Sequence, residues 1–407
     1  MAVTSSYSAP AARSASVPER VLLVSWGLPP SANGSSVIVE NLSHQFSPQE
    51  MVLAGQQWSG MESYRRDPKL PRIHLLNKEW TWPKRGQRYV RWTTWLTLPS
   101  VARRLARIAS DEHCDAIMAV FPNEFFVYAA SLAAKRLRLP YYLYFHNTYR
   151  ESRIGNAQRF AEWLEPRVFR QARAVFVMSD GMKAHYEPIY PQVRFESLVH
   201  SFSEPVPEFT PAPPPGQTLR LAFMGHLNGS NVDASRRLAE VVNRREDLQM
   251  TTYSGTPDWH FDNVGVSGPR ITHTRVAYEQ VMTELQSHDI LLLPHGFCGD
   301  VSQLEYDTIF PTRTISYLIS NRPILAHAPP NCFLTRWLRK YDCAEIVDER
   351  DTNKVEAAID RLRNDPLRRE QLVRNALQAA QQFYGPVVAK HLRQVMAETM
   401  APSLARA

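Results

Sequence analysis

Short apolar runs alternate with helix-like stretches along most of the chain, and this alternation is the strongest constraint on its fold. In the first half the strand-like runs are RVLLVSW (20–26), DAIMAVF (115–121), YYLYFHN (141–147) and AVFVMS (174–179). Amphipathic stretches of roughly 10–15 residues lie between them, which is the spacing of a parallel sheet whose strands are joined by helices. We therefore expect an α/β fold of the doubly wound, Rossmann-like type.

A proline-rich segment divides the chain into two such series. Residues 204–217, EPVPEFTPAPPPGQ, hold six prolines in 14 positions, which predicts a stiff linker. A second series of strand-like runs follows at once, with LRLAFMG (219–225), QMTTYSG (249–255) and ILLLP (290–294). The pattern predicts two Rossmann-like domains, 19–203 and 218–384, that face each other across a cleft at the carboxyl ends of their strands.

The two ends of the chain differ from these domains. Residues 1–18 are rich in Ser, Ala and Pro without an apolar core, so we expect a disordered tail, with an organelle transit peptide as a weaker alternative. Gly385-Pro386 interrupts a helical tail and starts a separate C-terminal helix, residues 385–407. No apolar run approaches the roughly 18–20 residues that span a bilayer.

The cysteines indicate a reducing compartment. Cys114, Cys298, Cys332 and Cys343 lie far apart and form no CxxC pair, so they predict neither a disulfide framework nor a zinc site. We expect a cytoplasmic protein without a metal.

The positive charge is concentrated in one segment. The chain carries a formal net charge of +7, and the segment Glu62–Arg107 holds 12 Lys/Arg against 3 Asp/Glu. Trp80, Trp82, Tyr89, Trp92 and Trp95 are interleaved with these cations, a composition that suits the surface of an anionic membrane. A solvated surface with its aromatic rings turned inward is the alternative. Charge alone supports binding to nucleic acid, and no recognition module accompanies it, so nucleic acid is not the expected partner.

Two strand-to-helix loops are candidates for binding an anion. ANGSS (32–36) contains Gly34 and Ser35, and the run GHLNGSN (225–231) contains Gly225, Asn228 and Gly229. Glycines let the backbone approach a ligand, and the free N–H groups at a helix start favour negative charge. Neither loop is a GxGxxG fingerprint or a Walker A loop, so dinucleotide and ATP binding are not indicated. Ordinary turn and cap chemistry is the alternative for each loop.

Two further residues stand where a ligand would lie. His146, followed by Asn147, ends the apolar run YYLYF, and the carboxyl end of a parallel strand faces the cleft. Arg313 follows Pro311-Thr312 at the start of a helix, where a permanent cation suits a pyrophosphate. The alternatives are a structural histidine and a surface arginine.

These residues carry a resemblance to a known family. The runs PPSANGSS, YFHNTY, ARAVFVMSDGMKAHY, RLAFMGHLNGSN and HDILLLPHGF, followed by FPTRTISYLISNRPILAHAPP, resemble in order and spacing the motifs of GT-B fold glycosyltransferases. The closest resemblance is to the large retaining family 4 group, and it covers nearly all of the chain after Pro18. It implies two Rossmann-like domains facing a cleft, with the C-terminal helix crossing back to pack on the first domain.

The resemblance also implies roles for individual residues. It places Gly34 and Ser35 near the donor phosphates and the acceptor, His146 on the transferred sugar as a catalytic residue, and the backbone near 266–272 on the base. The donor-binding residues it implies are Gly34, Ser35, Gly225, Asn228, Gly229, Thr312, Ser316 and Tyr317. Arg313, the second expected catalytic residue, replaces the usual lysine of the family.

This sequence departs from the family at its carboxylates and at one pair of cations. The family's paired glutamates fall on Thr308 and Ser316, and neither is acidic. The usual Arg/Lys pair of the second domain is not evident, which leaves Arg313, Arg236 and Arg275 as the available cations.

The function implied is transfer of a sugar from a nucleoside-diphosphate donor to a hydroxyl acceptor, of hexosyltransferase type and with retention. Helix N-termini and cations can stabilise a departing diphosphate, so neither a metal nor another cofactor is needed. The expected partners are a nucleotide sugar, a glycan or lipid-linked acceptor in polysaccharide biosynthesis, and the inner face of a membrane. Two alternatives stay open: a non-catalytic GT-B binding or partner subunit, and a GT-B enzyme that acts on nucleic acid.

Overall fold

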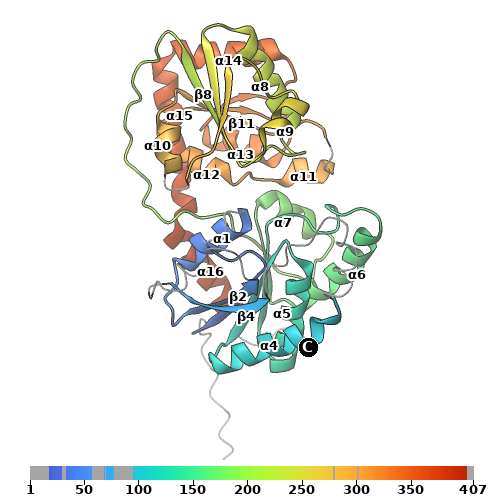
Figure 1. Cartoon of the computed structure of the whole chain (residues 1–407). Helices are drawn as coiled ribbons and strands as arrows, with labels where there is room; N and C mark the ends of the chain where they lie inside the picture. Colours follow the sequence, from blue (N-terminus) through green and yellow to red (C-terminus); the bar gives the residue numbers. More distant parts are fainter. Residues whose placement is uncertain are drawn as a thin grey trace, which may run out of the picture.

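The computed structural model contains two α/β domains stacked end to end (Figure 1). It describes residues 18–29, 34–56, 68, 70–77, 95–277, 280–299 and 302–400. The expected disordered tail, apart from residue 18, and most of the basic, aromatic segment therefore lie outside the described residues.

The first domain is built on a seven-stranded parallel sheet in the order β3-β2-β1-β4-β5-β6-β7. The central strands β4 and β5 are buried along their whole length, which explains why their sequences are apolar without alternation. The elements are β1 (Val21–Ser25), α1 (Gly34–Ser43), β2 (Met51–Gln56), β3 (Arg72–Asn77), α4 (Leu98–Asp111), β4 (Ala116–Phe121), α5 (Glu124–Leu137), β5 (Tyr141–Phe145), α6 (Asn156–Gln171), β6 (Ala174–Val177), α7 (Asp180–Tyr186) and β7 (Phe195–Ser197).

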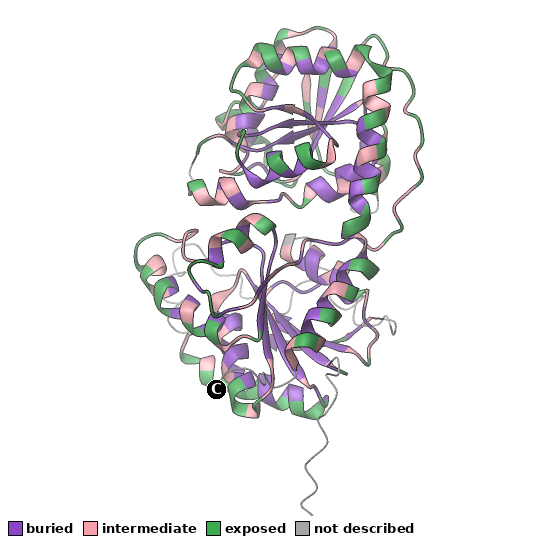
Figure 2. Cartoon of the chain, turned by 180° about the vertical axis from the view of Figure 1, so that it is seen from behind, coloured by how far each residue is buried: buried purple, intermediate pink, exposed green. Residues whose placement is uncertain are grey.

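The second domain repeats this plan with six parallel strands in the order β10-β9-β8-β11-β12-β13. Its elements are β8 (Leu219–Met224), α8 (Val232–Arg244), β9 (Leu248–Tyr253), α9 (Asp258–Asn263), β10 (Ile271–Thr274), α10 (Val281–Gln286), β11 (Ile290–Pro294), α11 (Gln303–Thr308), α12 (Arg313–Leu318), β12 (Ile324–His327), α13 (Phe333–Tyr341), β13 (Glu345–Val347), α14 (Thr352–Asn364), α15 (Pro366–Ala380) and the 3₁₀ turn η3 (Gln381–Phe383). In both domains the strand order reverses beside the first strand, and the buried sheet lies between helices whose outer faces are exposed (Figure 2).

The last helix, α16 (Gly385–Met400), returns to the first domain (Figure 1). Its apolar face, which includes Val388, Leu392 and Met396, joins the core beneath the first sheet. Tyr142 Oη donates a hydrogen bond to the carbonyl oxygen of Met396 at 3.2 Å. The expected fold, two Rossmann-like domains with a C-terminal helix that crosses back, is confirmed.

The proline-rich residues 204–217 form no helix or strand and run along the outside of the second domain (Figure 1). They are held there by Asn321, whose side chain accepts a hydrogen bond from the Thr210 N–H at 3.0 Å and donates one to the Glu208 carbonyl at 3.1 Å. No helix in the described part of the chain is long and apolar enough to cross a membrane.

Candidate functional site

A cavity of about 310 Å³ lies between the two domains. Its walls are formed where strands of both sheets end, because the two sheets point their carboxyl ends toward each other. The lining residues are Trp26, Ser35, Ile38, His146, Asn147, Met178 and His200 from the first domain, and Asn228, Ser230, Asn231, Pro294, His295, Ile309, Phe310, Pro311, Thr312 and Arg313 from the second.

The second-domain wall contains the start of α8. Asn231 braces the preceding loop: its Oδ1 accepts from the Asn228 N–H at 3.1 Å, and its Nδ2 donates to the His226 carbonyl at 3.0 Å. The side chain of Asn231 makes no cap bond to the helix, and the first N–H of the helix, that of Val232, donates to the Asn228 carbonyl at 3.0 Å. A helix of 13 residues that starts at a cavity wall supplies a partial positive charge for an anion.

Arg313 adds a full positive charge to the same wall. Its guanidinium lies 4.8 Å from the centre of the Phe223 ring, and a Cβ on Gly225 would stand 3.3 Å from its Cζ. Gly225 has a φ of +113°, a backbone conformation that favours glycine. The absence of a Cβ also lets the guanidinium lie close to the backbone.

No carboxylate within the described residues pairs with Arg313, and its Nη1 has no hydrogen-bond partner there. Burial lowers the pKa of this guanidinium, because the charged form is separated from water without compensation. The Arg313 side chain is half-buried, but its Nη1 is shielded from water. An unpaired cationic group shielded in this way is unfavourable, so the site is suited to an anionic ligand group.

His146 lies opposite, on the first-domain wall, and only 3% of its surface is exposed. Neither ring nitrogen has a hydrogen-bond partner in the described structure. Burial lowers the pKa of His146 well below its ordinary value, and repulsion from His200 adds to this effect. The imidazole is therefore neutral near pH 7 and offers one N–H donor and one nitrogen acceptor to a ligand.

His295 follows β11 on the second-domain wall. Its Nε2 donates to the Tyr306 carbonyl at 2.7 Å, so this nitrogen carries the proton and Nδ1 is left as an acceptor. Burial lowers the pKa of His295 to about 4, with a smaller contribution from Arg313.

Several of the predicted residues line the cavity, and others lie next to residues that line it. Ser35, His146, Asn228, Thr312 and Arg313 line the cavity. Gly34 begins α1, one position before Ser35. Gly225 lies against Arg313, and the carbonyl of Gly229 accepts from Tyr306 Oη at 2.8 Å.

The remaining predicted positions do not line the cavity. Tyr317 is fully buried and its hydroxyl accepts from the Met224 N–H at 2.7 Å, which fixes α12 against β8. Ser316 is half-buried on α12. Residues 266–272 lead into and begin the edge strand β10. Arg236 and Arg275 donate to the carbonyls of Val264 and Gly255.

Trp26, Met178, His200 and His295 were not predicted. His295 follows ILLLP as His146 follows YYLYF, so the same criterion, a polar residue directly after an apolar strand, would have found it. His200 follows β7, a strand of only three residues, whose sequence FES carries almost no strand signal.

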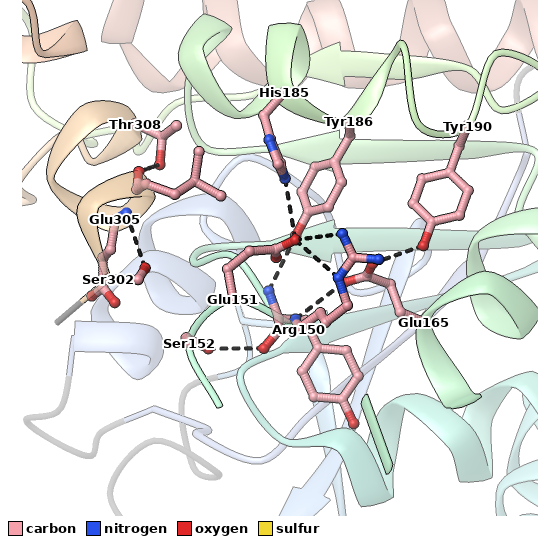
Figure 3. Close-up of polar contacts among 12 residues, drawn as sticks. Arg150, Glu151, Ser152, Glu165, His185, Tyr186, Tyr190, Ser302, Glu305 and Thr308 are labelled. Atoms are coloured by element: carbon pink, nitrogen blue, oxygen red, sulfur yellow. Dashed lines mark hydrogen bonds and ion pairs between the residues drawn. The ribbon is translucent and has the colours of Figure 1, made fainter. Parts of the chain in front are cut away.

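A second polar network lies beside the interdomain cleft (Figure 3). Glu165 is fully buried and accepts from the Arg150 N–H at 3.2 Å and from Tyr190 Oη at 2.8 Å. Arg150 pairs with Glu151, which also accepts from His185 at 3.3 Å. Burial and the nearby charge of Glu151 raise the pKa of Glu165 to about 7.

Comparison with known proteins assigns the fold. Residues 36–196 match the family of glycosyl transferase 4-like domains. HepE of Anabaena, solved in complex with UDP and glucose, superposes with a TM-score of 0.64 at 10% identity, over 93% of this chain and 99% of that one. Sucrose-phosphate synthase of Thermosynechococcus elongatus superposes with a TM-score of 0.68 at 14% identity, over 94% and 99% of the two chains.

The lipopolysaccharide outer core galactosyltransferase WaaB superposes with a TM-score of 0.62 at 11% identity, over 93% of this chain and 99% of that one. No curated protein matches in sequence. The chain has the GT-B fold. The expected resemblance to the family 4 group of glycosyltransferases is confirmed over residues 36–196.

Proposed function

From the GT-B fold and the glycosyl transferase 4-like match we infer that this protein is a glycosyltransferase, which binds a nucleoside-diphosphate sugar between its domains and transfers the sugar to a hydroxyl acceptor. One observation carries the proposal. Arg313, a half-buried cation that no described carboxylate pairs with, and the start of α8 form one wall of the cavity whose opposite wall holds His146. A diphosphate bound at this cation directs its sugar toward the imidazole.

The chemistry of the two walls is complementary to the transfer. Negative charge accumulates on the departing diphosphate, and fixed positive groups at that place lower the barrier. Arg313 and the α8 N-terminus are such groups, so we propose transfer that does not depend on a metal. The lowered pKa of His146 makes its imidazole a weak base, which suits a hydrogen bond to a sugar hydroxyl rather than proton abstraction.

We propose a hexosyl transfer with retention, in which the leaving phosphate oxygen takes the proton of the acceptor. The cavity lining supports this route, since the described residues that form it include no Asp or Glu to act as a base. A uridine nucleotide is the first donor to test, because HepE was solved with UDP and with UDP-glucose.

For the acceptor we propose a glycan or glycolipid intermediate of polysaccharide biosynthesis, used at the inner face of a membrane. The support is the basic segment Glu62–Arg107 of the sequence. Its described end includes Leu96, which is 80% exposed, and three exposed arginines of α4, namely Arg103, Arg104 and Arg107.

The test is a calorimetric titration of UDP and GDP, followed by incubation with a panel of labelled nucleotide sugars. We expect one diphosphate to bind and one nucleotide sugar to be hydrolysed or transferred. Absence of binding by both at millimolar concentration would overturn the proposal. Binding without turnover of any donor would favour a non-catalytic subunit, a reading consistent with the hydroxyls of Thr308 and Ser316 at the family's carboxylate positions.

A further inference from the structure

The first-domain wall holds a second buried histidine beside His146. His200 is 3% exposed, follows β7 and lines the same cavity. The centres of the two imidazole rings are 5.9 Å apart and the rings are nearly perpendicular, at 85°.

Neither ring nitrogen of His200 has a hydrogen-bond partner among the described residues, as for His146. Buried polar atoms are almost always satisfied in folded proteins, so four unsatisfied ring nitrogens on one wall require an explanation. The cavity supplies one, because a bound molecule can reach both rings.

Hydrogen bonds hold the backbone around His200 in place. A loosely held loop therefore does not explain why its ring nitrogens lack partners. The Leu198 carbonyl accepts from Tyr144 Oη at 2.8 Å, and the Ser201 carbonyl accepts from Asn41 Nδ2 at 2.9 Å. On the far side the Phe202 N–H donates to the Phe383 carbonyl at 3.2 Å. The imidazole is therefore presented to the cavity by a fixed segment.

The ligand group that suits this pair is a hydroxyl. Burial lowers the pKa of His200 to about 3, so both rings are neutral at pH 7. Two neutral imidazoles together offer two N–H donors and two acceptors. Each sugar hydroxyl is also both a donor and an acceptor, whereas a phosphate would be drawn to the cation of Arg313 on the opposite wall.

We propose that His200 is a specificity-determining residue, which together with His146 forms a subsite for the hydroxyls of a neutral sugar ring. Trp26, on the same wall, adds an aromatic side chain to this subsite. The inference rests on the proposed function, since it names what the first-domain wall recognises. The ring belongs either to the donor's hexose or to the acceptor.

The first experiment follows the histidine ring nitrogens of the isotope-labelled protein by NMR at pH 7. UDP alone is expected to leave the His200 signals in place. UDP-glucose, UDP-galactose and UDP-N-acetylglucosamine form one arm. Free glucose, galactose, mannose and N-acetylglucosamine, each added at tens of millimolar with UDP present, form the other. A shift in the first arm assigns the ring to the donor, and a shift only in the second assigns it to the acceptor.

The second experiment uses His200→Phe, which keeps an aromatic ring and removes both nitrogens. We expect the Kd for UDP to change by less than twofold, while affinity for the sugar that shifted His200 falls about tenfold. The melting temperature should rise by about 2–4 °C, because an unsatisfied buried polar group is removed. His295→Phe is the matched control, and it should lower the melting temperature because it breaks the bond to the Tyr306 carbonyl.

Three outcomes would overturn the inference. One is that no sugar in either arm moves the His200 signals. Another is that His200→Phe leaves sugar affinity unchanged while UDP still binds. The third is that His200→Phe lowers the melting temperature, which would show that the ring is satisfied within the fold. Failure of the proposed function is recognised separately, by the absence of UDP binding to the unmodified protein.

Discussion

Arg313 is the residue on which donor affinity should depend most. A hydrogen bond to a charged group contributes roughly 1.5–3 kcal/mol, so Arg313→Ala is expected to weaken UDP binding by about 10- to 100-fold. Ser316 lies on α12 outside the cavity lining, so Ser316→Ala should weaken binding less than Arg313→Ala. Ser316→Glu should tighten binding, because its longer side chain carries a carboxylate that accepts bonds from both ribose hydroxyls.

Calorimetry of UDP into these three variants checks the order of affinities. Arg236→Ala removes an exposed cation that does not line the cavity and is the matched control. Weaker binding by Ser316→Glu, together with unchanged binding by Arg313→Ala, would show that the diphosphate and the ribose lie elsewhere.

His146 is expected to act mainly on turnover. Its neutral ring faces the cavity from the wall opposite Arg313, so a bound diphosphate would not touch it. We predict that His146→Ala lowers kcat and kcat/KM together by at least about tenfold while the Kd for UDP stays within twofold, as for a contact made mainly in the transition state. A rise in KM alone would make His146 a ground-state contact.

The sequence predicted the cavity residues that follow strong local signals. His146 after YYLYF and Arg313 after Pro-Thr are marked by the chain itself, and both line the cavity. His200 is not marked, because its strand is three residues long and its partner ring is 54 positions away in the chain. Whether a buried imidazole has a hydrogen-bond partner depends on tertiary contacts, which local sequence does not encode.

At the scale of elements, the network joining α6 to the loop after β5 should make stability depend on pH. Glu165 has a folded pKa of about 7 against about 4.5 when unfolded, so the folded state holds the extra proton between these values. The contribution of Glu165 to the free energy of unfolding is fully present below pH 4.5. This contribution, on the order of 3 kcal/mol, is lost as the pH rises to 7.

Glu165→Gln leaves the side chain at this position uncharged at every pH. We therefore expect its free energy of unfolding, relative to the unmodified protein, to improve progressively from pH 4.5 to 7.5 in urea titrations. Glu162→Gln, a substitution at an exposed position of the same helix, is the control. It should change the free energy of unfolding by the same amount at pH 4.5 and at pH 7.5. An equal effect of Glu165→Gln at pH 5 and pH 8 would show that Glu165 titrates normally.

A second prediction at the scale of elements concerns the basic segment Glu62–Arg107, which extends into α4. Neutralising Arg85, Arg88 and Arg91, which lie outside the described residues, should release the protein from anionic vesicles, at about 1 kcal/mol per engaged cation. Neutralising Arg336, Arg339 and Lys340 on α13 removes the same charge from the second domain and should not. Equal release by both variants, or no vesicle binding by the unmodified protein, would contradict membrane docking through this segment.

At the scale of the whole molecule, the two-domain architecture was predictable because strand-like and helix-like stretches alternate regularly along the sequence. Runs such as LRLAFMG and ILLLP predicted their strands, and the six prolines of residues 204–217 marked the linker. The closeness of the domains was not predictable. It depends on contacts such as that of Ser179 Oγ with the Thr308 carbonyl, at 2.6 Å, which join residues 129 positions apart.

At Gly181 the backbone of the first domain packs tightly against the second domain. A Cβ there would stand 3.1 Å from Phe333 Cβ and 3.2 Å from Thr308 Cα, tighter than ordinary contact on the side of the second domain. Gly181→Val should therefore push α7 away from α11 and α13 and widen the cavity. Because a misplacement of about 1 Å can cost about 100-fold in rate, we expect kcat/KM to fall between 10- and 100-fold.

Arg313 and the start of α8, which we propose to hold the diphosphate, belong to the second domain, so Gly181→Val should leave the Kd for UDP within about twofold. Gly216→Val is the matched control, because that glycine lies in the linker with its nearest neighbour 3.8 Å away, and its activity should be normal. Small-angle scattering should show a larger radius of gyration for Gly181→Val alone. Unchanged turnover with unchanged dimensions would mean that the domains do not need this contact to assemble the site, and that His146 and Arg313 meet across the cavity by another movement.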